Sequence, residues 1–256
     1  MMVVAHADDE TLLAGGLISK LVSDGQDVRV LCLAPGNEDR AQRLRYACGV
    51  LGVNVVETLR YSEGAMWPDE VDKSMCHTRR NLDPQLAVVP VAEMASRIGG
   101  RITEFEPDVV ITHSSYGDYG HADHAVVYQA TKLAVETSGL DGTRLYALEW
   151  PRWLVQFNAR LMSLSGRDIR RMGSEGQFNL PMSLRESTYA EIVIDVSEEL
   201  RVRRIASRWY ASEIARGPLP LRLLERMPLI VQRVFLGKTR LCAVIVPEGF
   251  DIASSF

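Results

Sequence analysis

Short apolar runs, separated by segments of helical periodicity, recur along this 256-residue chain and limit the folds open to it. The run VVIT within 107–113 shows no alternation of apolar and polar residues, which is typical of strands buried on both faces of a parallel sheet. Helices must then cover both faces. The sequence therefore predicts an α/β fold, a Rossmann-like three-layer αβα sandwich with a mostly parallel sheet. After a first short strand that ends at His6, the expected strands are 28–34, 53–59, 107–113, 144–150, 190–196 and 240–248. The expected helices are a stretch from Leu12 to Val22, then 38–52, 91–105, 122–138 and 197–214.

The composition is that of an ordinary folded protein, with 46% hydrophobic and 24% charged residues. A formal charge of −4 gives no reason to expect nucleic-acid binding, which usually shows as a basic domain. The four cysteines form no CxxC pair, which argues against a disulfide framework or a cysteine-rich zinc site and favours a reducing compartment. The N-terminus lacks a basic n-region and an apolar h-region, so we expect a cytoplasmic protein without a secretory signal.

The chain shows no internal repeat, low-complexity tract or linker, so we expect one domain over 1–256. Two stretches, 61–85 and 151–181, depart from the strand–helix alternation, and long irregular stretches of this kind are often binding loops or lids. A third segment, 219–237, is apolar but broken by arginines and prolines. It could lie on a membrane surface. We favour a helix pair that covers the core or a subunit interface, so membrane contact is not expected and a homo-oligomer stays open.

Histidine and carboxylate side chains gather at the ends of two predicted strands. His6 and the acids of ADDE (7–10) follow the first strand, and HSSYGDYGHADH (113–124) follows the strand at 107–113. The carboxyl ends of parallel strands meet at one edge of a sheet, where doubly wound folds bind their ligands. Four of the five histidines lie in these two clusters. We therefore expect the two clusters to form one site.

Each cluster alone also has a purely structural explanation. The three acids could cap a helix and complement its dipole, His6 could be a buried core histidine, and Asp123 could cap a second helix. Their coincidence at one sheet edge favours chemistry instead. Two histidines and one aspartate suit zinc and leave one coordination position open for water.

Both clusters resemble sequence signatures of the PIG-L/LmbE-like zinc-dependent de-N-acetylases, which read roughly (P/A)HPDDE…GG and GHPDH. The matching stretches are AHADDE, followed by Gly15 and Gly16, and GDYGHADH. Two more segments, RAQRLRYACGVLGV (40–53) and IDVSEELRVRRIASRWYASE (194–213), are similar to further parts of the family in the same order. The resemblance covers about half of the chain.

The resemblance implies a zinc centre. The side chains that would bind Zn²⁺ are those of His6, Asp9 and His124. The ion would lower the pKa of a bound water and polarise an amide carbonyl. Asp8, adjacent to a ligand but not itself one, would be the general base. Ala7 and Ala122 replace the usual prolines of the two motifs, and we expect changed stiffness rather than lost metal binding because neither side chain takes part in the chemistry.

The resemblance also implies roles around the metal. Tyr119 would donate a hydrogen bond to the oxyanion of the tetrahedral intermediate. His121 would protonate the departing amine, and Asp123 would orient that imidazole and support its charge. Arg40 and Arg43 are candidates for contacts with substrate hydroxyls or an acidic group, although a solvated helix face explains them equally well.

The implied reaction is hydrolysis of an N-acetyl or other N-acyl group on an N-acetylglucosaminyl conjugate, the work of an amide hydrolase acting on linear amides. Natural-product and glycolipid-like scaffolds are both open, and aromatic and arginine side chains in the irregular loops suggest a substrate larger than a monosaccharide. Those side chains are Trp67, Trp153, Phe157, Arg170 and Arg171. Arg43 stands where the family commonly has an acid and Glu213 where it usually has glutamine, which puts its substrate contacts in doubt but not its chemistry.

Two other functions fit the same fold. A dinucleotide-binding oxidoreductase would need GxGxxG in the first strand–helix turn, where three acids would instead repel a pyrophosphate. The main alternative is a metal-binding protein of this fold without deacetylase activity, either regulatory or one that transforms an amide or thiol conjugate. The presence of Asp8, Tyr119, His121 and Asp123 favours hydrolysis.

Overall fold

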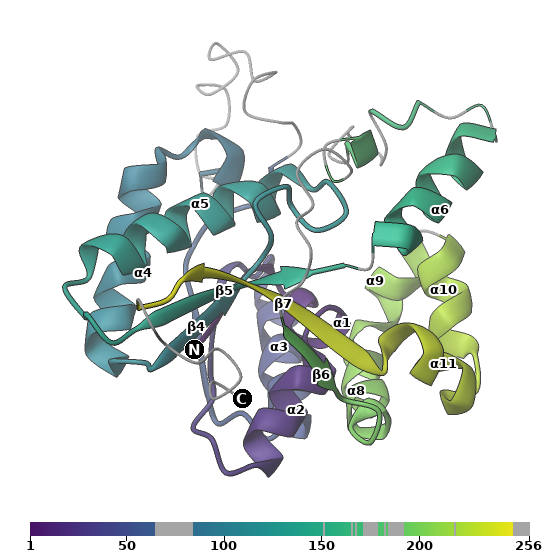
Figure 1. Ribbon diagram of the computed structural model, residues 1–256, viewed down its shortest axis with the longest axis horizontal. Coiled ribbons are helices and arrows are strands. Elements are labelled where there is room, and N and C mark those ends of the chain that lie inside the picture. Colours follow the sequence, from purple (N-terminus) through teal and green to yellow (C-terminus); the bar gives the residue numbers. More distant parts are fainter. Residues whose placement is uncertain are drawn as a thin grey trace.

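A computed structural model of the chain describes residues 1–64, 84–150, 152–164, 166, 168–170, 179–181, 183, 192–217 and 219–247. In this part of the chain, seven strands form one sheet in the order β3-β2-β1-β4-β5-β7-β6 (Figure 1). The first five strands are parallel to one another, whereas β7 runs antiparallel to both β5 and β6. The predicted mostly parallel α/β sandwich is therefore confirmed.

The predicted strands are all present, with ends shifted by a few residues. They are β1 (Met2–His6), β2 (Arg29–Ala34), β3 (Val55–Thr58), β4 (Val109–Thr112), β5 (Arg144–Glu149), β6 (Ile192–Asp195) and β7 (Lys238–Ile245). The helices that the structure describes are α1 (Asp9–Leu12), α2 (Gly15–Ser23), α3 (Glu38–Val50), η3 (Leu86–Val88), α4 (Val91–Phe105), α5 (Ala122–Thr137), α6 (Arg152–Leu164), α8 (Leu200–Ala206), η4 (Ser207–Tyr210), α9 (Ala211–Arg216), α10 (Leu219–Arg226) and α11 (Leu229–Leu236).

The expectation of an irregular stretch over 151–181 is wrong for its first part, which forms α6. Trp153, Phe157 and Leu161 recur at helical spacing and are the signal for this helix. All three are exposed, whereas Val155 and Ala159 of the same helix are buried, so α6 presents apolar side chains both to solvent and to the rest of the protein. Of the other irregular stretch, residues 65–83, with Trp67 and His77, lie outside the described residues.

The sheet separates two hydrophobic cores, and alternate residues of β1 enter opposite ones. Met2 and Val4 pack with side chains of α2, α3 and α8, whereas Val3 and Ala5 pack with side chains of α4 and α5 (Figure 1). Successive side chains of a strand point to opposite faces, so a strand buried on both faces must be apolar at every position. This explains why the predicted strands lack polar alternation.

The chain leaves β1 for β2 on one side and later returns to pair β4 with β1 on the other. This is the point where the strand order reverses, and ligands of open α/β sheets bind outside the carboxyl ends of the strands there. His6 is the last residue of β1, and His113 directly follows β4. The fold therefore brings the two sequence clusters to one edge, as expected.

Gly16 allows α2 to pack closely on the segment that follows β6. A Cβ at Gly16 would lie 2.9 Å from Cγ2 and 3.1 Å from Cβ of the buried Val196. Valine is branched at Cβ and has little rotamer freedom with which to move aside. The glycine after the first motif is therefore a packing requirement between the first helices and the C-terminal part of the chain.

We expect Gly16→Ala to lower the free energy of unfolding by about 1–3 kcal/mol, because the added methyl group overpacks against Val196. Gly49→Ala is the matched control, since Gly49 is also helical and a Cβ there meets nothing within 4 Å. That control should stabilise the protein by about 0.5–1 kcal/mol through helix propensity. Urea unfolding curves measure both values. Equal effects of the two substitutions would contradict the packing argument.

Candidate metal centre

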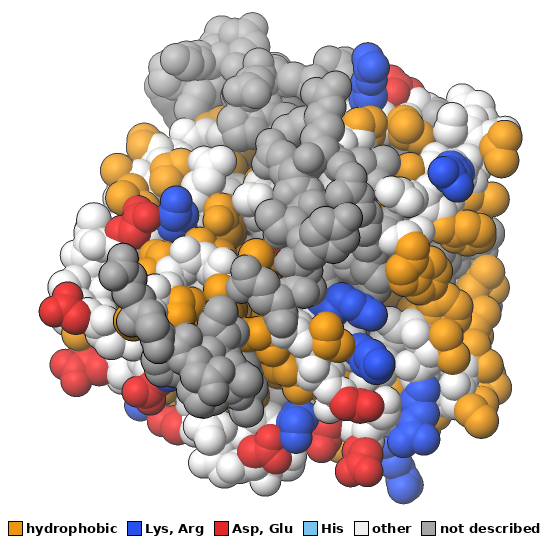
Figure 2. All heavy atoms as spheres, viewed as in Figure 1, with side chains coloured by type: hydrophobic (Ala, Val, Ile, Leu, Met, Phe, Trp, Pro, Cys, Tyr) orange, Lys and Arg blue, Asp and Glu red, His pale blue; other side chains and the backbone are white. Residues whose placement is uncertain are grey.

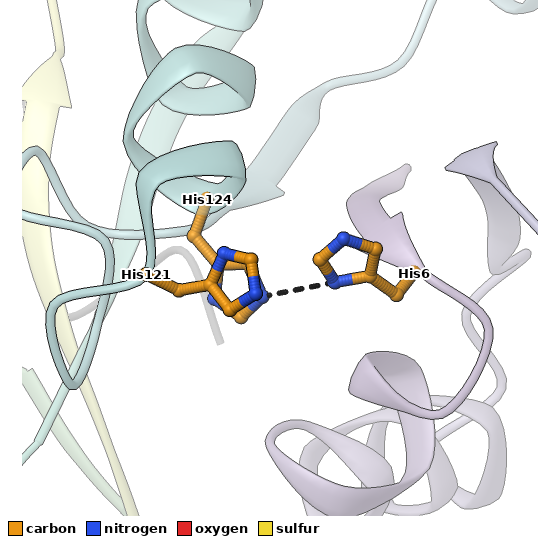
Figure 3. Close-up of side chains that lie close together, drawn as sticks. All are labelled: His6, His121 and His124. Carbon is orange, nitrogen blue, oxygen red and sulfur yellow. Dashed lines mark hydrogen bonds between the residues drawn. The ribbon is translucent and has the colours of Figure 1, made fainter. Parts of the chain in front are cut away.

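Three ligand atoms from the two sequence clusters form a nearly equilateral triangle. His6 Nδ1 lies 3.4 Å from Asp9 Oδ2 and 3.3 Å from His124 Nε2, and Asp9 Oδ2 lies 3.3 Å from His124 Nε2. Figure 3 shows the His6 ring facing His124 across the gap between β1 and α5. A tetrahedral zinc ion with bonds of about 2.0–2.1 Å separates its ligand atoms by about 3.3–3.4 Å. The three side chains therefore fit such an ion.

His113 and His121 also belong to the histidine cluster. His121 groups with His6 and His124, and His113 groups with Asp9 and His124. In each group the potential ligand atoms lie within 4.8 Å of one another. His113 Nε2 accepts a hydrogen bond of 2.8 Å from the Ala5 N–H, so its lone pair is engaged. His121 stacks on His124 with ring centroids 4.6 Å apart, and its Nδ1 accepts the Asp123 N–H at 3.2 Å. The tighter spacing of His6, Asp9 and His124 favours that set as the ligands.

Asp118 fixes the orientation of His124. Its Oδ2 lies 2.7 Å from His124 Nδ1 and 2.6 Å from His113 Nδ1. An ionised carboxylate can only accept, so both Nδ1 atoms carry a proton and His124 presents the lone pair of Nε2 to the triangle. Burial alone would raise the pKa of Asp118, but the two imidazoles hold it below its ordinary value. Asp118 was not among the site residues expected from the sequence, although it lies within the motif GDYGHADH.

Asp123 supports His6, which differs from its expected role. Its Oδ2 lies 3.0 Å from His6 Nε2 and accepts the Gly64 N–H at 2.7 Å, whereas only its backbone N–H contacts His121. The reason is local: His121 is the N-cap of α5 and accepts the N–H of Asp123 as a helix-capping bond. The Asp123 carboxylate is then free to turn towards β1. Each histidine of the triangle is therefore backed by a carboxylate.

Asp8 occupies a strained turn between β1 and α1. Its φ of 142° is rare for a residue other than glycine, and strain of this kind is concentrated at functional sites. The turn is held by Glu10, whose Oε2 accepts the Asp8 N–H at 3.0 Å and whose Oε1 accepts the Tyr210 hydroxyl at 2.8 Å. Burial raises the pKa of Glu10 to about 8. Glu10 thus supports the turn from within the core, beside Asp8 and Asp9.

Arg40 pairs with Asp8. Its Nη2 lies 3.1 Å from Asp8 Oδ2, its Nε donates to the Ala7 carbonyl at 3.0 Å, and it also bonds Glu63. Burial and the neighbouring charge of Asp9 raise the pKa of Asp8 to about 7, while Arg40 opposes this rise. Arg40, expected as a substrate contact, therefore lies against the proposed base.

Tyr119 lies beside the triangle, half-buried, with its ring centroid 5.4 Å from that of His124. The next residue, Gly120, has a φ of +91°, and a Cβ there would lie 2.2 Å from the Asn179 carbonyl oxygen. A side chain at position 120 would clash with the backbone of Asn179, so the motif needs glycine there. Of the aromatic and arginine side chains expected near the substrate, Trp153, Phe157 and Arg170 are exposed, and Trp67 and Arg171 lie outside the described residues.

Arg43 and Glu213, two of the positions expected to depart from the family pattern, pair with each other. Arg43 Nη1 lies 2.9 Å from both carboxylate oxygens of Glu213, and Glu213 Oε1 lies 4.0 Å from Arg40 Nε. Burial alone would raise the pKa of Glu213, but the Ser212 hydrogen bond and the charges of Arg43 and Arg40 lower it below its ordinary value. The positive charge of Arg43 is therefore paired with the carboxylate of Glu213.

A double-mutant cycle over Arg43→Met and Glu213→Gln should give a coupling energy of about 0.5–1 kcal/mol, because the pair is mostly shielded from water. The matched control is Arg45→Met with Glu38→Gln, a pair on the same helix at 3.1 Å but with exposed side chains. We expect coupling near zero there. Chemical denaturation of the variants measures both energies. Equal coupling in the two pairs would contradict the balance inferred between Arg43 and Glu213.

The metal-free protein should lose stability as the pH rises from about 6.5 to 9. Burial alone would lower the pKa of His124, but the charges and hydrogen bonds of Asp9 and Asp118 raise it to about 9. Because this folded value exceeds the unfolded value of about 6.5, the stabilisation is fully present below pH 6.5 and is lost as the pH passes through 9. Urea unfolding of chelated protein measures this slope.

His124→Gln is the control for this slope and should flatten it. Metal-loaded protein should show a less negative or reversed slope, since a metal binds only the neutral imidazole. A chelated wild-type protein whose stability rises over the same range would contradict the assignment of His124.

The chain is similar to known proteins along most of its length. The family model described as PIG-L, GlcNAc-PI de-N-acetylase, matches residues 1–135. Two relatives carry the name 1D-myo-inositol 2-acetamido-2-deoxy-alpha-D-glucopyranoside deacetylase. The one from Mycobacterium sp. (strain JLS) is 28% identical over 242 residues, which cover 85% of this chain and 75% of the relative. The one from Tsukamurella paurometabola is 30% identical over 291 residues, which cover 98% of this chain and 96% of the relative.

Two solved structures share the fold. N,N'-diacetylchitobiose deacetylase from Pyrococcus horikoshii superposes with a TM-score of 0.59 at 13% identity, covering 95% of this chain and 82% of that one. The 4-carboxy-2-hydroxymuconate hydratase GalB from Pseudomonas putida gives 0.54 at 16% identity, covering 98% of each chain. At these identities the structures establish the fold alone. The match over residues 1–135 and the Tsukamurella relative, together with the motifs that form the triangle, establish that this chain belongs to the PIG-L (GlcNAc-PI de-N-acetylase) family.

Proposed function

We propose that this protein is a zinc-dependent N-deacetylase that hydrolyses the N-acetyl group of an N-acetylglucosaminyl conjugate. The observation that carries the proposal is the triangle of His6, Asp9 and His124 with Asp8 beside it. The names of its relatives support the same reaction class. We further propose that 1–256 form one catalytic domain. A cytoplasmic location fits the cysteines that the structure describes, which are free.

Zn²⁺ bound by His6, Asp9 and His124 would acidify a water molecule and polarise the acyl carbonyl. Asp8 would take the proton from the attacking water. In the metal-free protein, burial and the charge of Asp9 raise the pKa of Asp8 to about 7. Zinc would lower the pKa of the bound water, so that a carboxylate can accept its proton. The strained turn and the bond to Arg40 would hold the carboxylate in place. Asp118 and Asp123 would keep the two ligand imidazoles in their binding orientation.

Two further groups would complete the reaction. Tyr119, beside His124, would donate a hydrogen bond to the oxyanion that forms when water attacks. His121 accepts the Asp123 N–H at Nδ1, so the proton of its neutral ring is on Nε2. The departing amine must leave as a neutral amine, and the proton it needs would be the one that Asp8 takes from the attacking water, because a neutral imidazole that lost its proton would become an imidazolate. We assign His121 Nε2–H as the group that donates a hydrogen bond at the departing nitrogen. Asp123 would act on His121 through its backbone rather than its carboxylate.

The first substrate to test is an N-acetylglucosaminyl-inositol, because two relatives are named for that compound. The test is release of acetate from a panel of N-acetylglucosaminyl conjugates, with chelated and zinc-restored protein compared. Release that requires zinc supports the proposal. A protein that binds zinc in the triangle but releases acetate from none of the conjugates would favour the alternative, a non-deacetylating member of the fold. The hydratase GalB, which covers 98% of both chains, is a specific reason to keep that alternative.

Asp8→Asn should keep bound zinc and lose about 10²- to 10⁴-fold in kcat, because the amide cannot accept the proton of water. Asp141→Asn, at an exposed position remote from the triangle in the sequence, is the matched control and should keep wild-type turnover. Metal content by atomic absorption separates lost binding from lost catalysis. Wild-type turnover in Asp8→Asn would exclude Asp8 as the base.

A further inference from the structure

Four apolar side chains of α6 form a stripe that faces solvent, while Val155 and Ala159 of the same helix are buried. Trp153, Phe157, Leu161 and Leu164 follow one another at helical spacing, and all are exposed, Leu164 to 86%. An amphipathic helix normally turns such a stripe to the core. Single exposed apolar side chains need no explanation, but a contiguous group indicates an interaction surface.

The helix pair α10–α11 continues this stripe. Leu223, Ile230 and Val234 are exposed, the last two to 77% and 73%. The Trp153 and Phe235 rings, with centroids 6.2 Å apart, join α6 to α11. Figure 1 shows α6, α10 and α11 together at one end of the molecule, opposite α4 and α5, and Figure 2 shows orange apolar atoms along that edge. Coverage of the core does not account for the exposed side chains of 219–237, whereas a subunit interface or another partner would cover them.

The exposed charges on these helices are all positive. Arg160 on α6, Arg226 on α10 and Arg233 on α11 are exposed. The stretches 152–164 and 219–236 contain one acid, Glu225, and it is turned inward. Its side chain is 6% exposed and bonds the buried Arg203 at 2.7 Å. We call the exposed apolar and arginine side chains of α6, α10 and α11 the arginine–apolar face.

We propose that the arginine–apolar face docks onto an anionic lipid surface. Helices that lie in a membrane interface combine a buried apolar side with basic residues that meet lipid phosphates. No helix in the described part of the chain is long and apolar enough to cross a bilayer, so the contact would be peripheral. The overall charge of −4 makes this basic face more distinctive, since it must be balanced by acids elsewhere.

Two other occupants fit less well. A second copy of the chain would bring arginines against arginines in a symmetric contact, and like charges there are costly. A nucleic acid would meet the arginines but would offer little to Ile230, Val234 and Leu164, because phosphates and stacked bases contact basic and aromatic side chains. Aliphatic side chains beside arginines instead match acyl chains beneath phosphate groups.

Flotation of the full chain with vesicles tests the proposal. We expect binding to vesicles of phosphatidylcholine with about one-third phosphatidylglycerol, and little binding to phosphatidylcholine alone, because each arginine adds to the attraction only at an anionic surface. Arg226→Glu with Arg233→Glu should reduce the bound fraction at least about tenfold. Ile230→Gln with Val234→Gln should reduce it similarly by removing the inserted apolar area.

Matched controls lie at the other end of the molecule. Lys132→Glu on α5 reverses one charge, half the change made by the arginine pair, and Val55→Gln on β3 removes an exposed apolar side chain. Both should float like the wild type. Acetate release from a soluble conjugate should stay at the wild-type level in all four variants, which separates docking from catalysis and from misfolding. If the variant Ile230→Gln with Val234→Gln fails to fold, the flotation of Arg226→Glu with Arg233→Glu still tests the proposal, because both arginines are exposed in the native state.

Three outcomes would overturn the proposal. The first is absence of flotation, or equal flotation with both vesicle types. The second is a concentration-dependent dimer that Ile230→Gln with Val234→Gln abolishes, which would make the face a self-association surface. The third is a shift of single-stranded RNA or duplex DNA in a gel that the arginine pair abolishes while flotation is absent.

Discussion

The pairing of His6 and of His124 with a buried carboxylate is the constraint on which the proposed metal site depends. A histidine can bind a metal through one nitrogen only if the proton stays on the other, and Asp118 and Asp123 fix that choice for His124 and His6. Without them the two rings could turn or exchange tautomers, and the triangle would lose its spacing. The carboxylates are held in turn by backbone N–H groups of Ser114 and Gly64. The geometry of the metal centre therefore extends into the loops around it.

The buried carboxylates make the site strongly negative, which accounts for the raised pKa values of His6 and His124. Burial alone would lower the pKa of His6 and of His124, yet neighbouring acids raise both. A cluster that draws protons onto buried imidazoles will equally favour a divalent cation in their place. The raised pKa values follow from the same close contacts that space the triangle, and both favour a metal at this point.

The meeting of the two clusters could be predicted from the strand ends, because parallel strands bring such ends to one edge of a sheet. The choice of His6, Asp9 and His124 within them came from the resemblance to the family motifs. The partner of Asp123 was out of reach, because a single residue offers both a backbone N–H and a carboxylate, and only the three-dimensional turn shows that they serve different histidines.

Two other features also needed the folded chain. The pairing of Arg43 with Glu213 joins residues that 170 positions separate, and no local pattern links them. The expectation of an irregular stretch over 151–181 missed α6 itself, and the helical spacing of its apolar residues does not say which medium they face. Local periodicity thus predicts elements and strand ends, whereas pairings between distant side chains depend on the completed fold.

The bond between Tyr210 and Glu10 has a consequence for how the protein matures. It joins residues 200 positions apart, and it completes the turn that carries Asp8 and Asp9. During synthesis the N-terminal residues emerge first, and contacts this distant in sequence form late. Until η4 docks, a carboxylate destined for the core lacks one of its partners, and the catalytic turn has no reason to settle in its strained form. A product that ends before Tyr210 would carry both motifs and still lack the bond that completes the support of Glu10 beneath the turn.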